Sequence, residues 1–555
     1  MRPRFATIGR YYRTISHLRA AQLWHRARLR AKKFAYCHRP AFFEKRWRQS
    51  DASHAQWPDT FLSLDQELPP QCPSAECNSE GIFEFLGERR DLGKVVDWAA
   101  PDAPQLWRYN LHYWEWAFAL ADHPDRMWAQ DRFLALWRSW RTSTTVGRWD
   151  AWSPYVASIR AWVFCNLYGP LVSQTTGDRD FTSDLAMHAR FLRANLELDV
   201  GGNHLIKNLK ALVGLGIFLA DEDLRVMAVT ELVSQLAVQV LADGGHYERS
   251  PSYHCQVLGD VLDVHQLLQS MNLPEDPALD STIAAMRRWL GVMIMPDGEL
   301  PLFNDAWQLP VAKIQHLRPT PRPQDHLTVL RESGYAVLRP DNRIHLVADV
   351  GDPCPPDLPA HAHADCLSFE LSFNGRRVIV DPGVTTYAPG AQRRWERSTA
   401  AHNTVEIDGC DQTEVWGTFR AGRLAHATIL EASERRDGRL RLVASHDGYR
   451  HLPGHPEHRR TFIVEPGKVL ILDQIAGLGV HTMKHRLNMA RWEPTSKDIL
   501  TLSVSETSAV EFVRTTECVP GRPASVQHPN RPAIEQKVVT LTAPLPVCWH
   551  TTIEV

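Results

Sequence analysis

The sequence lacks the features that mark several common protein classes. Its 62 Lys and Arg residues nearly balance its 64 Asp and Glu residues, so the formal net charge is only -2. A dedicated nucleic-acid-binding protein normally carries a basic excess, and this class is therefore disfavoured. No apolar run approaches the roughly eighteen residues that a membrane-spanning helix needs. An anionic ligand would have to be bound by local basic patches.

Disulfide and export signals are also missing. The ten cysteines are scattered and form no Cys-x-x-Cys pair, which excludes a zinc ribbon and a dithiol redox motif. We interpret them as reduced core residues. The first twenty residues are positively charged but contain no apolar h-region, so no signal peptide is predicted. We therefore expect a cytoplasmic protein, with the periplasm as the alternative location.

The length of 555 residues and the hydrophobic content of 44% predict two or three domains. Residues 1–70 form a basic, aromatic segment in which residues 15–34 are expected to form one amphipathic helix. A solvated helix packed on the main body is the preferred interpretation, and a membrane or partner contact is the alternative. Residues 69–78 are rich in proline and polar residues and are predicted to be a linker.

The hydrophobic pattern changes from a helical to a strand period along the chain. Between residues 105 and 318, apolar residues recur at three and four positions, which predicts successive helices such as 205–220, 223–242 and 251–270. This period is compatible with a bundle, a solenoid or an α/α toroid. After residue 327 the period is two, which predicts strands at 334–338, 344–350, 367–373, 377–380, 404–407, 440–445, 460–464 and 469–473.

Helices followed by strands argue against a βα-repeating fold and indicate an α+β chain of several domains. We expect a helical domain at 71–325 and an antiparallel β domain at 326–555. The Asn374-Gly375 pair predicts a hairpin turn between two of the strands.

Two polar clusters stand at predicted helix starts. The sequence GGNH at 201–204 opens one helix, and Asn203 alone would most simply be an N-cap. The sequence DGGHYERSPSYH at 243–254 opens another, with Pro251 as the first helical residue and Tyr253 in the first turn. One helix separates them, so both starts are expected at the same rim. Free N–H groups and helix dipoles favour an anion there.

A third cluster suits a metal ion. On a strand, the sequence HAHAD would place His361, His363 and Asp365 on one face. Asp381 ends one predicted strand, and His402 lies just before another. Two histidines and a carboxylate suit zinc or a similar divalent ion with an open coordination position. A simple hairpin at 374–375 would leave Asp381 several residues from His363, so the set requires a bend or bulge.

The sequences GGNHLIKNLKAL, DGGHYERSPSYH, HAHADCLSFELSFNGRRVIVDPG and RSTAAHNTVEIDG resemble the heparinase II/III superfamily of polysaccharide lyases, in this order. The similarity spans roughly residues 100–480, and the last two motifs are the most specific. The resemblance implies an N-terminal α/α toroid followed by an antiparallel β-sandwich domain. It also implies a lyase that cleaves a uronic-acid-containing polysaccharide, glycosaminoglycan-like or alginate-like, by β-elimination.

The resemblance further implies a role for individual residues. Asn203 and His204 would sit at the substrate carboxylate, Tyr253 would be the Brønsted base, acid or both, and His361 would be a second acid/base residue. His363, Asp381 and His402 would bind one divalent metal ion, zinc or in some relatives manganese. Tyr387 lies where related lyases often carry another active-site tyrosine.

Further substrate contacts are expected around these groups. Tyrosine has a pKa of about 10 in water, so Tyr253 needs cationic neighbours that lower its pKa. Arg249, His254 and His361 are the candidates for this role. Of the 19 tryptophans, many lie before residue 170, where sugar subsites could use their flat faces. The predicted substrate-binding residues are therefore Arg249, His254, Tyr387, Trp107, Tyr109 and His112.

Three other functions stay open at this point. The metal set could activate water in a hydrolase. A glycosidase would need a carboxylate pair, and none stands out. The basic N-terminal segment also resembles lyase-like proteins of exopolysaccharide synthesis, so the chain could be a non-catalytic polysaccharide-binding protein of an assembly pathway. The combination of Asn203, Tyr253 and His361 favours an enzyme, because a binding protein needs no tyrosine base. An acidic polysaccharide is the expected partner.

Overall fold

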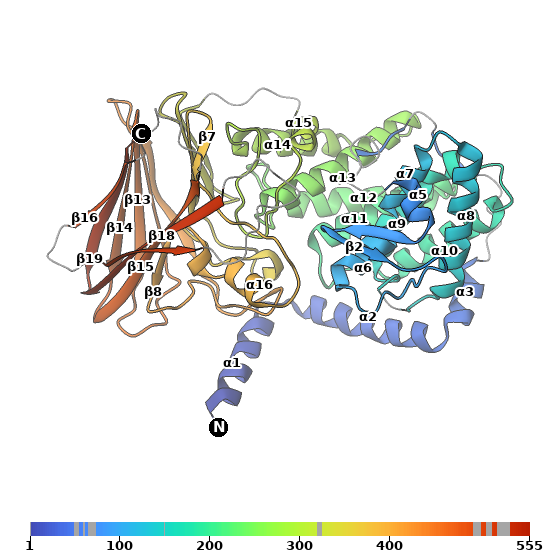
Figure 1. Cartoon of the computed structure of the whole chain (residues 1–555), viewed down its shortest axis with the longest axis horizontal. Helices are drawn as coiled ribbons and strands as arrows, with labels where there is room; N and C mark the ends of the chain where they lie inside the picture. The colour runs from blue at the N-terminus through green and yellow to red at the C-terminus, as the bar shows by residue number, and fades with distance from the viewer. Residues whose placement is uncertain are drawn as a thin grey trace. The chain divides into compact units, whose positions relative to one another are not determined.

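The computed structural model describes residues 2–48, 55–58, 61–64, 74–148, 150–318, 325–491, 501–506, 513–518 and 533–554. The chain divides into two compact units. Unit 1 comprises residues 1–18, 239–255 and 284–555, and unit 2 comprises residues 19–238 and 256–283. Residues 69–73 of the predicted linker at 69–78 lie outside the described residues. Trp149 lies outside them too. In Figure 1, unit 2 is mostly helical and unit 1 carries the large sheets.

Unit 2 is built from successive helices around a buried centre. Helix α9 is buried from Val156 to Leu167 and packs against α6, α10 and α11. The helical elements and one small hairpin of this part of the chain are α2 (Ala20–His38), α3 (Pro40–Arg48), α5 (Ala75–Ser79), β1 (Ile82–Phe85), β2 (Glu88–Asp91), α6 (Gln105–Tyr113), α7 (Phe118–Ala121), α8 (Arg126–Ser143), α9 (Pro154–Leu167), α10 (Asp178–Ala194), α11 (Gly202–Phe218) and α12 (Glu222–Gln239). Helices α13 (Pro251–Ser270) and α14 (Pro277–Met293) contribute residues to both units.

The helical period predicted three of these helices closely, and two local expectations were wrong. Helices α11, α12 and α13 match the predicted ranges to within three residues at each end. The single helix expected at 15–34 is instead two helices, α1 (Arg2–Ser16) and α2, because the chain turns at residues 17–19. Asn203 is not an N-cap. Helix α11 already begins at Gly202, because Gly201 adopts a φ of 71° that glycine tolerates at no steric cost.

The described residues of unit 1 contain two large antiparallel sheets, as predicted for the C-terminal half, and a small two-stranded sheet of β9 (Val415–Trp416) and β10 (Arg420–Ala421). Among the described residues, the larger sheet has the order β17 (Val513–Cys518), β18 (Ala533–Pro544), β15 (Val480–Arg491), β7 (Arg376–Ile379), β6 (Phe369–Phe373), β5 (Ile344–Asp349), β4 (Tyr335–Leu338) and β3 (Leu327–Leu330), with β8 (Val405–Ile407) paired to β15. The smaller sheet has the order β11 (Ala427–Glu434), β12 (Leu440–His446), β13 (Glu457–Glu465), β14 (Lys468–Ala476), β19 (Val547–Glu554) and β16 (Thr501–Glu506).

The two sheets share one apolar core. Leu346 and Leu371 of the larger sheet belong to the same buried cluster as Leu442 and Ile471 of the smaller sheet. Side chains from two facing sheets that fill a common core define a β-sandwich.

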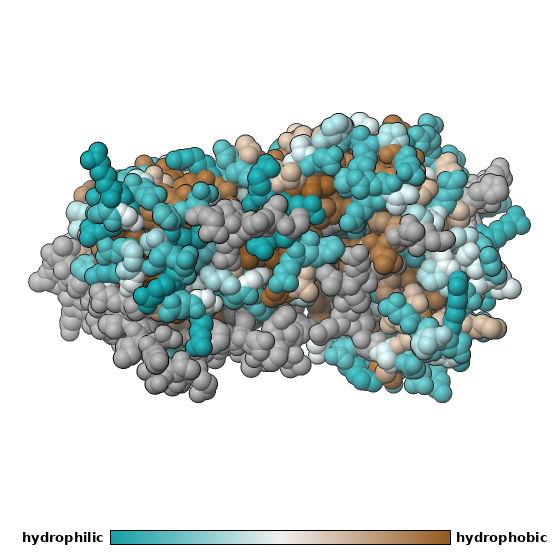
Figure 2. Space-filling view, turned by 90° about the horizontal axis from the view of Figure 1, so that it is seen from above, coloured by the Kyte–Doolittle hydropathy of each residue, from teal (hydrophilic) through white to brown (hydrophobic). Residues whose placement is uncertain are grey.

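Figure 2 shows one face of the molecule, on which hydrophilic residues predominate and hydrophobic residues lie between them. The fold is therefore the predicted helical N-terminal region followed by an antiparallel β-sandwich. No helix in the described ranges is sufficiently long and apolar to cross a membrane.

The predicted hairpin is present and contains a β-bulge. Asn374 and Gly375 both adopt left-handed φ angles, of 48° and 81°, as a two-residue type I′ turn needs. The ladder between β6 and β7 shifts register between Leu371 and Ser372. Such a bulge changes which residues stand opposite each other beyond it.

The HAHAD sequence does not form the expected strand. It begins in a short 3-10 turn, Pro359–His361, and continues as irregular chain up to β6. Its backbone N–H groups bond to a side chain and a loop carbonyl instead of to a neighbouring strand. The His363 N–H donates to Asn304 Oδ1 at 2.9 Å, and the Ala364 N–H donates to the Arg397 carbonyl oxygen at 3.0 Å. Because the segment lies outside the ladder, its side chains are not restricted to two alternating faces.

Candidate active site

Two tyrosines and a histidine meet in unit 1. Tyr253 lies in the first turn of α13, and its Oη is 3.1 Å from the Oη of Tyr387. The Tyr253 ring centroid lies 3.9 Å from that of His361 and 4.9 Å from that of Trp307. Tyr253 and Tyr387 are both partly exposed, whereas His361 is buried. The structure therefore brings three predicted site residues together and leaves the two tyrosines partly exposed.

Asp305, a residue that the sequence analysis missed, connects His361 to His363. Its Oδ2 lies 3.0 Å from His361 Nδ1, and its Oδ1 lies 2.8 Å from His363 Nε2. Arg393 donates to both carboxylate oxygens and is itself buried. Burial alone would raise the pKa of Asp305, but Arg393 and the two imidazole hydrogen bonds hold this pKa well below its usual value. Asp305 is therefore an ionised carboxylate at the centre of the site.

The charge of Asp305 fixes the orientation of both imidazoles. An ionised carboxylate can only accept hydrogen bonds, so His361 and His363 each donate an N–H to it. The nitrogens that do not face Asp305 are then His361 Nε2 and His363 Nδ1. The carboxylate of Glu248, another buried residue that the sequence analysis missed, lies 4.0 Å from His361 Nε2. His361 thus has one nitrogen held by Asp305 and one nitrogen available for proton transfer.

A weak sequence signal for Asp305 exists in retrospect. It is a single acidic residue in the short segment LFNDAW, in which Leu302, Phe303 and Ala306 are all buried. A buried carboxylate in apolar surroundings needs a cation and several donors. Arg393, the cation, lies on α16 (Ala391–Glu396), 88 residues further along the chain. This separation hides the pair from any local pattern.

We expect the substitution Arg393→Met to destabilise the fold by about 3–5 kcal/mol, because it leaves the Asp305 charge buried without its cation. Denaturant unfolding followed by circular dichroism measures this change in the free energy of unfolding. Arg394→Met is the matched control, since Arg394 is the exposed neighbour on the same helix. Equal stability of the two variants would contradict the assigned role of Arg393.

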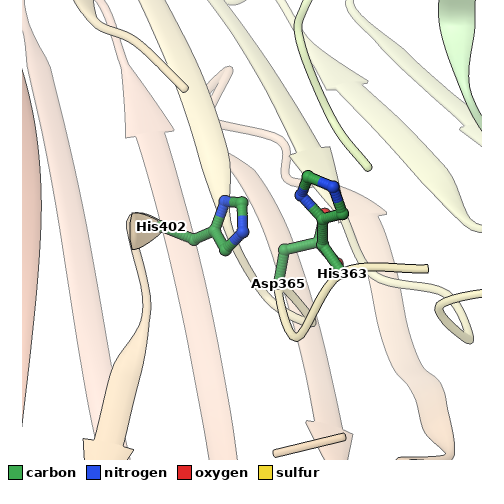
Figure 3. A group of neighbouring side chains, drawn as sticks. All are labelled: His363, Asp365 and His402. Atoms are coloured by element: carbon green, nitrogen blue, oxygen red, sulfur yellow. The ribbon is translucent and has the colours of Figure 1, made fainter. Parts of the chain in front are cut away.

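Three buried side chains converge on a point that suits a cation. Figure 3 shows His363, Asp365 and His402 turned toward one another, and their ligand atoms all lie within 4.8 Å of one another. Within the described part of the chain, His363 Nδ1, Asp365 Oδ1 and His402 Nε2 have no hydrogen-bond partner. Buried polar atoms are normally satisfied, so three such atoms in one place fit a metal ion. Two imidazoles and one carboxylate are a donor set that zinc accepts.

Asp381 lies directly behind His402. Its Oδ2 is 2.8 Å from His402 Nδ1. Burial lowers the pKa of His402, but the Asp381 carboxylate outweighs burial and raises this pKa to about 9. A carboxylate that holds the second nitrogen of a ligating imidazole is a common support in metal sites. Asp305 supports His363 in the same way. The direct ligation by Asp381 stays a prediction, and the structure places Asp365, already part of the HAHAD cluster, beside His363 and His402 as a candidate ligand.

The buried amide of Asn403 holds the His402 segment in place. Its Nδ2 donates to the carbonyl oxygens of Phe369, at 2.8 Å, and of Val380, at 3.0 Å. These two carbonyls belong to the ends of the bulged hairpin that carries Asp381. This bridge joins the His402 segment to the hairpin that carries Asp381.

In unit 2, the predicted carboxylate-binding pair stands at the start of α11. Gln256 Nε2, on α13, donates to Asn203 Oδ1 at 3.4 Å and to Tyr155 Oη at 3.1 Å. The His204 ring lies 4.3 Å from the Tyr155 ring, and its Nδ1 is 3.1 Å from a carboxylate oxygen of Glu197. The contact between α11 and α13 at this end agrees with the shared rim that was expected from the helix order.

Two residues that were expected to assist Tyr253 are engaged elsewhere. Arg249 donates to the carbonyl oxygens of Asp352, at 2.6 Å, and of Glu332, at 3.3 Å. His254 is buried against Trp289, with ring centroids 4.2 Å apart. Burial, followed by the nearby His246, lowers the pKa of His254 to about 3, so its ring is neutral. The expectation that His254 supplies a positive charge was therefore wrong.

The aromatic residues that were expected to line sugar subsites belong mostly to the core. Trp107 is fully buried, with its Nε1 donating to the Glu88 carbonyl oxygen at 2.9 Å. His112 is buried beside Trp140, and burial lowers its pKa to about 3. Tyr109 remains partly exposed, and burial of its hydroxyl raises its pKa to about 12. The substrate contacts predicted for Trp107 and His112 are corrected to packing roles.

Two family models match the chain, one over the mainly helical region and one over the β-sandwich region. Residues 79–318 match the family Heparinase II/III N-terminus, and residues 322–537 match the family Heparinase II/III-like, C-terminal. The chain belongs to the heparinase II/III superfamily.

Individual relatives show how far the similarity extends. The chain is 30% identical over 389 residues to the FtsZ-localized protein C of Caulobacter vibrioides, covering 67% of this chain and 65% of that protein. It is 26% identical over 315 residues to a heparin-sulfate lyase of Bacteroides stercoris, covering 50% of this chain and 44% of that protein. In both cases the match spans less than two thirds of the relative's length. A crystal structure of heparinase III shares the fold, with a TM-score of 0.70 at 17% identity over 93% of this chain and 89% of that one.

Proposed function

We propose that the chain is an active lyase that cleaves a uronic-acid-containing polysaccharide by β-elimination. One observation carries the proposal. The hydroxyl of the partly exposed Tyr253 lies 3.1 Å from that of Tyr387, and the Tyr253 ring packs on His361, whose Nδ1 is held by Asp305. A purely structural role would not require two neighbouring, partly exposed tyrosines beside an oriented imidazole.

The reaction removes the proton next to the uronate carboxylate, and the electron pair of the broken C–H bond forms a double bond as the oxygen at C4 leaves. Tyr253 is proposed to transfer the proton, as base and then as acid to the leaving oxygen. His361, through its Nε2, is the second acid/base group. The role of Asn203 and His204 as donors to a substrate carboxylate, where negative charge would develop, stays a prediction of the family resemblance.

The metal would support this arrangement from the sandwich. His363 and His402 would hold it, with Asp365 or Asp381 as the carboxylate ligand. A divalent ion supplies positive charge that offsets the buried carboxylates around it. The role of the residues themselves is to keep the segment 361–365 in one conformation, so that His361 faces Tyr253.

The test is the formation of an unsaturated uronate. We expect that incubation with a panel of heparan sulfate, hyaluronan, chondroitin and alginate yields an ultraviolet-absorbing product with at least one polymer, because only a lyase creates a conjugated double bond. The Tyr253→Phe protein is the control for non-enzymatic cleavage. New reducing ends without ultraviolet absorbance would identify a hydrolase instead, and binding without either product would identify a non-catalytic polysaccharide-binding protein.

The similarity to the FtsZ-localized protein C favours a second candidate, a protein that associates with FtsZ. The observation is the 30% identity over 389 residues. Co-sedimentation of the purified chain with polymerised FtsZ from the same organism tests it. This result is independent of the lyase assay, since a chain can both bind a protein and cleave a polymer.

A further inference from the structure

Helix α2 in unit 2 has the reverse of the usual orientation for a surface helix. Leu23, Trp24, Ala27, Ala31 and Phe34 recur at spacings of three and four, and all five side chains are exposed. Trp24 and Phe34 are each 66% exposed. A helix that only packs on its own domain turns its apolar stripe inward. The stripe of α2 therefore lacks the covering that apolar side chains of this size normally have within a fold.

Contacts on the other side of α2 hold it in this rotation. Lys32 Nζ donates to the carbonyl oxygen of Ala194, the last residue of α10, where the helix dipole favours a cation. Tyr36 is buried, and its Oη donates to Asn195 Oδ1 at 3.1 Å. Turning the apolar stripe toward the protein would break these contacts. Figure 1 shows α2 at the outer edge of the helical unit.

The charged side chains of this N-terminal region are all basic. The first 43 residues contain no Asp or Glu. Exposed Arg30 and Lys33 lie next to Ala31 and Phe34 of the stripe. The basic residues of these 43 positions are Arg2, Arg4, Arg10, Arg13, Arg19, Arg26, Arg28, Arg30, Lys32, Lys33 and Arg39. The surface therefore matches a partner that offers negative charge and an apolar layer together.

Helix α1, in unit 1, repeats the pattern independently. Ile8, Tyr12 and Ile15 stand at positions i, i+4 and i+7, and all three are exposed. Tyr12 is 74% exposed. On the inner side, Arg13 Nε donates to Glu414 Oε2 at 2.8 Å, so the charged group again faces the protein. Two consecutive helices thus combine exposed apolar stripes with a purely basic sequence.

We propose that α2 binds the surface of an anionic phospholipid bilayer. Trp24 and Phe34 enter the interfacial region, and Arg30 and Lys33 contact the headgroup phosphates. An amphipathic helix with aromatic residues on one side and basic residues beside them is the type that lies in the plane of a membrane surface. Basic residues near an anionic leaflet strengthen such binding. A nucleic acid would use the charges but would leave the apolar stripe uncovered.

Co-sedimentation of the full chain with phospholipid vesicles tests the proposal. Vesicles of phosphatidylcholine alone are compared with vesicles that also contain phosphatidylglycerol. We expect binding to the anionic vesicles only, weakened by added salt. The double variant Trp24→Ser, Phe34→Ser is expected to bind about tenfold or more weakly, because it removes the two largest apolar groups of the stripe. The double variant Arg30→Glu, Lys33→Glu is expected to lose binding as well.

The matched control is the double variant Val226→Ser, Val238→Ser. Both valines are exposed on α12 of the same unit, 47% and 59% respectively, and this helix also carries Glu222, Asp223 and Glu231. Its vesicle binding should equal that of the unchanged chain. Circular dichroism confirms that every variant is folded.

Three outcomes would overturn the proposal. The first is absence of vesicle binding by the unchanged chain. The second is equal binding to neutral and anionic vesicles. The third is dimerisation in sedimentation velocity that the Trp24→Ser, Phe34→Ser variant abolishes in the absence of vesicle binding, which would assign the stripe to a second copy of the chain. The lyase assay on soluble oligosaccharides is unaffected by any of these results, so failure of one proposal does not imply failure of the other.

Discussion

The Tyr253→Phe variant is expected to keep its fold and to lose at least about a hundredfold in turnover, the lower end of what general acid–base catalysis contributes. The substitution removes one oxygen atom, and the ring contacts with His361 and Trp307 can remain. The loss should therefore appear in kcat rather than in stability. Initial rates from the ultraviolet absorbance of the product measure it.

Tyr247→Phe is the matched control for this experiment. Tyr247 belongs to the same DGGHYERSPSYH sequence and is also partly exposed, but its ring packs on His246 at 5.1 Å. We expect near-normal turnover for this control. If Tyr253→Phe also keeps near-normal turnover, the assignment of Tyr253 is wrong, and Tyr387 becomes the candidate proton donor.

The second large effect is expected for His402→Ala. We expect the unchanged protein to contain a divalent metal in stoichiometric amount and the variant to lose it. His402 Nε2 is one of the three buried ligand atoms at this site that have no hydrogen-bond partner among the described residues, and alanine removes it. Elemental analysis by mass spectrometry measures the metal. His265→Ala is the control. His265 lies with Glu275 and Asp280 in a second cluster of possible ligand residues, which is more exposed than the cluster of His402.

The same measurement distinguishes the two carboxylates. If Asp365 is the ligand, Asp365→Asn should lower the metal content more than Asp381→Asn, which would weaken only the support behind His402. The reverse order would establish Asp381 as the direct ligand. An active protein without metal, in both the unchanged chain and His402→Ala, would contradict the site.

The periodic elements of this fold could be predicted from the sequence because they depend on local patterns. The helix period defined α11, α12 and α13, and the strand period together with Asn374-Gly375 defined the hairpin of β6 and β7. Short sequence motifs identified Tyr253, His361 and His363 as candidate site residues. Each of these features needs information from only a few neighbouring residues.

Features that depend on distant contacts could not be predicted in this way. Asp305 and Arg393 are joined only by the folded chain, and no period links them. The sequence shows that α2 is amphipathic, but it does not show that Lys32 and Tyr36 face the protein while Trp24 faces solvent. Burial also determines whether an aromatic residue can contact a substrate. A tryptophan near a motif has the same local sequence whether it contacts a sugar or, like Trp107, packs in the core.

The shared carboxylate of Asp305 couples two equilibria that would otherwise be separate. It accepts an N–H from His361 and an N–H from His363, so a change in the charge of either ring alters the acceptor that the other one uses. A cation bound at His363 Nδ1 therefore changes the proton affinity of His361. By thermodynamic reciprocity, protonation of His361 changes the affinity for the cation by the same factor. If a cation binds at His363, proton exchange at His361 and cation binding would thus form a single linked system.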